Sequence, residues 1–305
     1  MTTPMDIVEE FPVRKTKKQK DAFRQEVQAN AKGMGYPVTV EKGMFGAQNV
    51  VIGDPETAKC LVSAHYDTCA RLPFPNLITP CSLLPFIAYQ ALAALCIVIP
   101  PMILGILAGL FIYEGLIGPV IYLGVFAILA LMLAGPANPS NVNDNTSGVV
   151  TVLEIARSLT EIHRQKVCFV LFDLEEAGLW GSASYRKAHK KATNEQIVIN
   201  LDCVGDGDHI RLFPTKKLKK DRKKLTSFYK ACGYFGKKDI LVHEKGFSVY
   251  PSDQGNFPYG VGICALRVSK FGLYLGKIHT PRDTHLDITN VNLLRAAVAT
   301  YIQEG

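Results

Sequence analysis

Several common features are missing from this sequence, and each absence narrows what the protein can be. The eight cysteines include no C-x-x-C pair and show no regular spacing. The opening segment, MTTPMDIVEEFPVRKTKKQK, has no apolar core, so we expect no secretory signal peptide. We therefore predict buried free thiols in a reducing compartment rather than a disulfide framework.

Charge is also missing from a long central segment. Residues 72–133 contain one charged side chain, Glu114, although the whole chain has a formal net charge of +7. About 20 apolar residues suffice to cross a bilayer. We predict a transmembrane helical hairpin within residues 82–133, with Glu114 in the far loop and a kink at Pro100 and Pro101. A hairpin buried in a soluble core is the alternative, but an α/β domain of this size rarely needs two such helices.

The hairpin fixes which parts of the chain share a compartment. Two spans return the chain to its starting side, and the basic residues Lys59 and Arg71 on that side predict the cytoplasm by the positive-inside rule. We expect a protein of the cell membrane that contacts the bilayer through residues 82–133. The basic run from Lys216 to Lys224 fits either contact with acidic lipid head groups or a solvated helix face. No aromatic platform accompanies it, so nucleic-acid binding is not expected.

Outside the hairpin, short apolar runs alternate with amphipathic segments. The runs 60–65, 168–172 and 196–201 have the composition of strands buried on both faces of a parallel sheet. Residues 16–34, 147–159 and 288–302 have helical apolar spacing. This pattern predicts a three-layer α/β/α domain with a mostly parallel central sheet. We predict that residues 1–71 and 136–305 form this domain and that residues 72–135 form the inserted hairpin.

Polar side chains follow these strands where a parallel sheet places its ligand sites. Taken singly, each has an ordinary interpretation as a turn, cap or core-edge residue. Together they supply imidazole nitrogens and carboxylate oxygens, which are the donors that a pair of zinc ions prefers. The five candidate ligands are His65, Asp144, Glu176, Asp202 and His279.

Two further carboxylates belong to the same pattern. Asp67 follows His65 by two positions, and a ligating imidazole normally donates its second N–H to such a partner. Glu175 precedes Glu176 at the end of one strand, so one carboxylate can bind a cation while its neighbour handles a proton.

The motifs that contain these residues resemble those of a known family. SAHYDT, NDNTSG, FDLEEAGLWGS, NLDCVG and KIHTPRDT are similar to motifs of the co-catalytic zinc aminopeptidases, metallopeptidase family twenty-eight, which also includes the glutaminyl cyclases. The resemblance covers residues 49–67 and 138–302. It departs from the family in the long insertion between His65 and Asp144, in Gln254 where relatives often have histidine, and in Leu174 where a small residue is usual.

The resemblance implies a role for each residue. Asp144 would bridge two Zn²⁺ ions, His65 and Asp202 would complete one site, and Glu176 and His279 the other. Glu175 would be the general base, and Asp67 the partner of His65.

The expected function is therefore a membrane-anchored di-zinc aminopeptidase that acts on peptides. Because the hairpin leaves the sheet between two ligand-bearing segments, we expect the active-site mouth to lie near the bilayer and to favour short apolar peptides. Two alternatives stay open: a glutaminyl cyclase-like acyltransferase, which needs only one zinc, and a non-catalytic membrane scaffold that has kept the fold.

Overall fold

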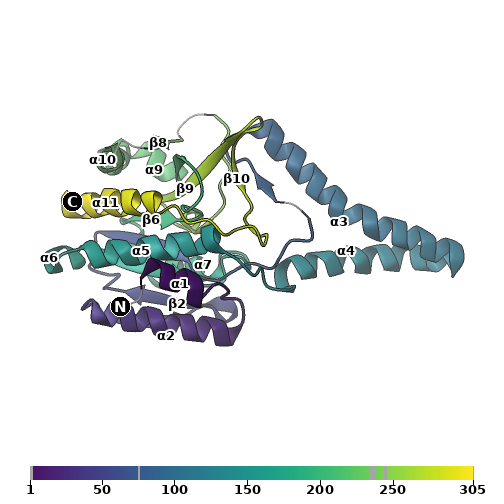
Figure 1. Ribbon diagram of the computed structural model, residues 1–305, viewed down its shortest axis with the longest axis horizontal. Coiled ribbons are helices and arrows are strands. Elements are labelled where there is room, and N and C mark those ends of the chain that lie inside the picture. Colours follow the sequence, from purple (N-terminus) through teal and green to yellow (C-terminus); the bar gives the residue numbers. More distant parts are fainter. Residues whose placement is uncertain (1–2, 75, 234–237, 244–245, 305) are drawn as a thin grey trace.

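A mixed β-sheet forms the centre of the part of the molecule that the sequence predicts to be catalytic (the catalytic part) in the computed structural model (Figure 1). The structure describes residues 3–74, 76–233, 238–243 and 246–304. Within them the sheet has ten strands, in the order β1-β2-β5-β3-β6-β9-β10-β4, and β7 joins β8 to β9. The strands are β1 (Val38–Lys42), β2 (Gln48–Ile52), β3 (Cys60–His65), β4 (Leu77–Ile78), β5 (Val167–Phe172), β6 (Ile197–Leu201), β7 (His209–Pro214), β8 (Asp239–Val242), β9 (Gly260–Ser269) and β10 (Gly272–Gly276).

The four central strands β5, β3, β6 and β9 are parallel, as the sequence predicts, and antiparallel strands continue the sheet on both sides. All six residues of β3 and all six of β5 are buried. Successive side chains point to opposite faces, so Phe169 and Leu171 enter one core cluster while Val170 and Phe172 enter another. A strand that is covered on both faces must be apolar throughout, which explains the uninterrupted runs.

Helices cover both faces of this sheet and give the predicted three layers. The larger core cluster joins the sheet to α2, α5, α10 and α11, and the smaller one joins the opposite face to Tyr185 of α7. The helices of the catalytic part are α1 (Pro4–Glu10), α2 (Lys17–Gly33), α5 (Ser147–Ser158), α6 (Glu161–Arg164), α7 (Trp180–Ala188), α8 (Lys190–Thr193), α9 (Lys216–Lys220), α10 (Arg222–Gly233) and α11 (Ile288–Glu304).

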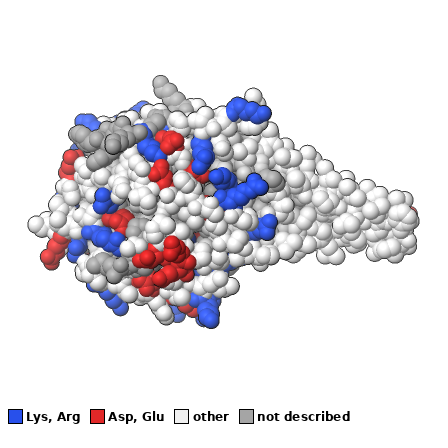
Figure 2. All heavy atoms as spheres, in the orientation of Figure 1, with Lys and Arg blue, Asp and Glu red and all other residues white. Residues whose placement is uncertain are grey.

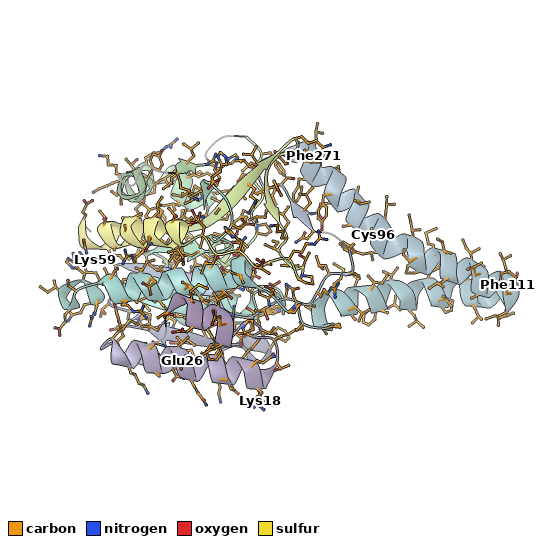
Figure 3. All side chains as sticks on the ribbon, viewed as in Figure 1. Lys18, Glu26, Lys59, Cys96, Phe111 and Phe271 are labelled. Atoms are coloured by element: carbon orange, nitrogen blue, oxygen red, sulfur yellow. The ribbon has the colours of Figure 1, made fainter. Side chains whose placement is uncertain are left out.

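The apolar block forms two antiparallel helices that project away from the sheet (Figure 1). These are α3 (Leu83–Phe111) and α4 (Ile117–Ala134), joined by the short turn η2 (Glu114–Leu116). Both helices are long and apolar enough to cross a membrane, and only 11% and 0% of their most apolar windows are buried. The projection is white along its length in Figure 2, and Phe111 lies at its tip (Figure 3). The hairpin is therefore not the core of a soluble domain.

The base of the hairpin is fixed to the catalytic part at several points. β4, which lies just before α3, pairs antiparallel with β10, so the inserted segment contributes a strand to the sheet. Ala70 and Ala137 form a bridge between the incoming and outgoing chain. On the other side, Lys15 Nζ donates a hydrogen bond of 2.9 Å to the Leu133 carbonyl at the end of α4.

The basic run at residues 216–224 does not lie beside the hairpin. It forms α9 and the start of α10, at the end of the catalytic part away from α3 and α4 (Figure 1). Two of its lysines, Lys217 and Lys224, lie 4.3 and 3.8 Å from the centre of the Tyr259 ring. The lipid-contact interpretation needs this run next to the membrane helices, so the structure favours the solvated helix face.

Basic side chains do lie near the base of the hairpin, but they come from other segments. Arg71, Lys277 and Arg282 line one cavity of about 550 Å³ together with the chain that leads into α3. Figure 2 shows basic side chains at the base of the white projection. A sequence run could not reveal this group because its members are far apart in the chain.

The packing of α3 on α4 depends on small residues. A Cβ atom at Gly105 would lie 2.6 Å from the Ile121 side chain and 2.8 Å from the Ile117 carbonyl oxygen. We expect Gly105→Val to force the helices apart and to destabilise the hairpin by about 1–3 kcal/mol, the usual effect of overpacking. The measurement is an SDS titration of the full chain in mixed micelles, followed by circular dichroism. Ala91→Val, at an exposed position of α3, is the control, and equal midpoints for the two variants would contradict this packing.

Candidate metal centre

The five predicted ligands meet at the carboxyl edge of the parallel strands. His65 is the last residue of β3, Asp202 follows β6, and Glu176 follows β5. Asp144 comes from the helical turn η3 (Val142–Thr146) that precedes α5, and His279 from the loop after β10. Because β3, β5 and β6 run in parallel, their last residues lie at one edge of the sheet.

Asp144 lies between the two histidines. Its Oδ1 is 3.2 Å from His65 Nε2, and its Oδ2 is 2.9 Å from His279 Nε2. Each carboxylate oxygen therefore faces a different imidazole. This is the arrangement that a carboxylate bridging two metal ions requires.

The remaining donors divide between the two sides of Asp144. Asp202 Oδ1 lies 3.6 Å from His65 Nε2, whereas Glu176 Oε2 lies 3.4 Å from His279 Nε2. Donor atoms of His65, Asp144 and Asp202 all lie within 4.8 Å of one another. Among the described residues, no hydrogen bond reaches Asp202 Oδ1 or Glu176 Oε1, although both atoms are buried. Buried carboxylate oxygens without a partner are unfavourable, so these residues fit divalent cations.

The ionisation of these groups also favours a bound cation. Burial, with a smaller contribution from the charge of Asp144, raises the pKa of Glu176 to about 8, against the attraction of His279. Burial disfavours the charged form of His279, but Glu176 and Asp144 outweigh this effect and raise its pKa to about 9. Hydrogen bonds from His279 and His65 lower the pKa of Asp144, although burial opposes them. A metal ion would replace the protons that otherwise neutralise these neighbouring carboxylates.

Glu175 lies beside the ligands and lines the same cavity of about 220 Å³. Burial raises its pKa well above the usual range, and repulsion from Glu176, Asp253 and Asp202 adds to this, while His65 acts in the opposite direction. A carboxylate whose proton affinity is increased in this way is suited to accept and return a proton near neutral pH.

Asp67 connects His65 to the two glutamates. His65 Nδ1 is 3.6 Å from Asp67 Oδ1 and 3.2 Å from the Asp67 carbonyl oxygen. The same carboxylate accepts the backbone N–H of Glu175 at 3.1 Å and that of Glu176 at 3.3 Å. Nδ1 therefore faces Asp67, although its hydrogen bond goes to the backbone carbonyl and not to the carboxylate that the H-x-D pattern predicts. Nε2 is left to face Asp144 and Asp202.

Several residues that the sequence analysis did not single out hold the ligand loops in place. Asp283 accepts the backbone N–H groups of Asn143 at 2.8 Å and Asp144 at 3.0 Å. Asn145 accepts the N–H of Cys203 at 3.2 Å, which ties the Asp144 turn to the loop of Asp202. Asp283 lies in the motif KIHTPRDT and Asn145 in the motif NDNTSG. The motifs therefore include both residues, but the roles of these residues depend on contacts between segments that are far apart in the chain.

Arg14 is a second buried group that the sequence analysis missed. Its guanidinium donates to the carbonyl oxygens of Tyr66 and Phe11 and to Thr146 Oγ1. Burial lowers its pKa to about 10, against the attraction of Asp67 and Asp144. Arg14 therefore supplies positive charge behind the carboxylates, and no local pattern in the N-terminal segment indicates this.

Two of the three departures from the family motifs are single residues, Gln254 and Leu174. Gln254 is buried away from the cavity, where it accepts a hydrogen bond from Asn200 at 3.1 Å and donates one to the Tyr250 carbonyl at 2.8 Å. Leu174 has φ 54, a left-handed conformation that favours glycine, directly before the glutamate pair.

The cysteines agree with the prediction of free thiols. Seven of them are described, all are free, and five of the seven are buried; the side chain of Cys232 lies outside the described residues. Cys69 is within reach of Glu176 and His279. Burial raises the pKa of its thiol, and the negative charges of Glu176 and Asp144 raise it further.

Comparison with known proteins decides the family. The profile of Peptidase family M28 matches residues 132–302, which is more than half of the chain. The chain belongs to peptidase family M28. The comparison with curated protein sequences found no match. Family membership supports a zinc-dependent, hydrolase-like protein and agrees with the imidazole and carboxylate donors described above.

Solved structures show the same fold in this M28 chain. A glutaminyl cyclase from Porphyromonas gingivalis has a TM-score of 0.62 and 17% identity over 97% of this chain and 93% of that chain. The LapA aminopeptidase from Legionella pneumophila has a TM-score of 0.61 and 14% identity over 99% and 69%. A Zn-dependent exopeptidase from Parabacteroides distasonis has a TM-score of 0.60 and 17% identity over 98% and 94%. At such identities the likeness establishes the fold and leaves the activity open.

The contacts of Asp67 lead to a test of the centre. In Asp67→Asn, an N–H₂ group replaces one of the two oxygens, so the backbone N–H of either Glu175 or Glu176 loses its acceptor. We expect zinc affinity to fall by about 10- to 100-fold, the usual effect of losing a partner of a ligating histidine. Competition with a chromophoric chelator measures this. Asp54→Asn is the control, because Asp54 also accepts a backbone N–H but lies in an exposed turn; unchanged affinity in Asp67→Asn would show that Asp67 does not support the ligands.

Proposed function

We propose that this M28 protein is a membrane-anchored di-zinc aminopeptidase. The position of Asp144 carries the proposal, because its two oxygens face His65 at 3.2 Å and His279 at 2.9 Å. A site for a single ion needs only one of these contacts. With Asp202 on one side and Glu176 on the other, each ion would have one imidazole, one terminal carboxylate and the shared Asp144.

Each residue near this site has a defined part in the proposed reaction. Bound zinc would supply Lewis acidity toward the attacking water and the scissile carbonyl. Glu175 accepts the proton of the attacking water and returns it to the leaving amine. His65 is held in the required tautomer by Asp67, and Asp283 fixes the backbone of Asp144. The small cavity and its burial restrict how much water surrounds these groups.

The hairpin is the proposed membrane anchor, with residues 1–71 and 136–305 as the catalytic unit. The exposure of α3 and α4 supports insertion into a bilayer. Arg71, Lys277 and Arg282 near the base of the hairpin support a cytoplasmic position for the catalytic unit under the positive-inside rule. These side chains, rather than residues 216–224, are placed to meet acidic lipid head groups.

A second candidate is glutaminyl cyclisation, and one observation favours it. Asp253 begins η4 (Asp253–Asn256), is fully buried, and has no hydrogen bond to its carboxylate oxygens among the described residues. Its charge acts on Glu175. Two neighbouring carboxylates can pass a proton between them, which is what ring closure of an N-terminal glutamine requires.

Hydrolysis by zinc-loaded protein tests the peptidase proposal. We expect the wild type to release p-nitroaniline from aminoacyl-p-nitroanilides, and Glu175→Gln to lose about 10²- to 10⁴-fold in kcat, the usual contribution of a general base. Zinc content should stay unchanged, because Glu175 is not a proposed ligand. Glu161→Gln, at an exposed position of α6, is the control.

The same assay separates the alternatives. Cyclisation of a glutaminyl peptide without p-nitroanilide hydrolysis would contradict the peptidase and support the cyclase. A folded chain that binds no zinc and processes neither substrate would contradict both enzymes and support the non-catalytic membrane scaffold.

A further inference from the structure

Two cavities meet at the proposed metal site. The smaller one, the metal cavity, has about 220 Å³ and contains the ligands of both proposed ions. The larger one, the hairpin cavity, has about 440 Å³ and lies between the catalytic part and the base of the hairpin. Glu176, His279 and Gln90 line both cavities, so the two spaces adjoin at the metal site.

The outer wall of the hairpin cavity is made by the membrane helices. Ala93 and Ile97 of α3 and Met132 and Leu133 of α4 line it. These side chains are apolar, and the ionisable ligands Glu176 and His279 lie where the cavity adjoins the metal site. A space of this size is within the usual range for small-molecule sites. Its position between two membrane-spanning helices gives it an apolar boundary toward the bilayer.

Gln90 is the one amide side chain of α3. It is exposed and lines both cavities, and its side-chain amide forms no hydrogen bond with a described residue. An unpaired amide in a membrane helix is unfavourable, and such groups usually serve a binding function. At the junction of the cavities, Gln90 can pair with the amide group of a bound substrate.

We propose that the hairpin cavity binds the aliphatic chain of an amphiphilic substrate, an aminoacyl amide whose leaving amine carries a lipid-like alkyl group. This inference rests on the proposed function. The metal cavity, about half as large, takes the aminoacyl group, and the alkyl chain of the leaving amine extends between α3 and α4. In the reaction the amide C–N bond breaks, the hydroxyl of water joins the carbonyl carbon, and Glu175 passes the proton to the amine.

The test is a series of leucyl n-alkylamides, from ethyl to decyl, with protein in phosphatidylcholine nanodiscs. For the wild type, kcat/KM should rise about three- to fourfold for each methylene that enters the cavity, as burial of a CH₂ group predicts. Ala93→Phe fills the cavity wall, so the ratio of decyl to ethyl activity should fall at least tenfold. Ala91→Phe, at an exposed position of the same helix, is the matched control. Partition into the lipid is common to all three proteins and cancels in the comparison.

Equal decyl-to-ethyl ratios in Ala93→Phe and Ala91→Phe would overturn the inference, even if both hydrolyse the ethyl amide. Absence of hydrolysis for every amide would instead count against the proposed function. A binding measurement then still tests whether the alkyl chain enters the hairpin cavity. A leucyl decylamide with a terminal diazirine is irradiated together with the Glu175→Gln variant. It should label α3 near Ile97 and α4 near Met132. Labelling of lipid-facing positions alone, such as Leu92, would overturn the inference.

Discussion

Repulsion among buried carboxylates is the constraint on which this structure depends. Asp144, Glu175, Glu176 and Asp202 lie at one edge of the sheet with two imidazoles between them. Like charges at such distances are unfavourable unless protons or cations compensate them. Arg14 supplies positive charge behind the site, where it approaches Asp67 and Asp144. The open side is left for metal ions, and this explains why two carboxylate oxygens there have no hydrogen bond.

The sheet and the hairpin use the same edge of the molecule. Parallel strands bring His65, Glu176 and Asp202 together, and the chain enters the apolar insertion soon after His65 and begins α3 at Leu83. β4 and the Ala70–Ala137 bridge hold the base of the hairpin against this edge. Figure 3 shows Phe271, in the turn between β9 and β10, next to the start of α3. α3 therefore forms part of the walls of both cavities at the proposed metal site, and α4 forms part of the wall of the larger one.

The sequence pattern within each segment predicted most of the features that depend on that segment alone. Apolar runs that end in His65, in Glu175 and Glu176 or in Asp202 identified the central strands and the site edge, because burial on both faces demands such runs. The free thiols and the exposed hairpin followed in the same way. The roles of Arg14 and Asp283 could not be predicted, since their partners are distant in sequence. The run at residues 216–224 left two interpretations open for the same reason: its charge was evident, but its position relative to the hairpin was not.

The arrangement of Asp144 between two metal ions is tested most directly by anomalous diffraction at the zinc absorption edge from the zinc-loaded full chain. The account predicts two peaks about 3.5–4 Å apart, as in other two-metal sites, one beside His65 and Asp202 and one beside Glu176 and His279. A single peak, or a second peak bound by Cys69 and not by Asp144, would contradict it.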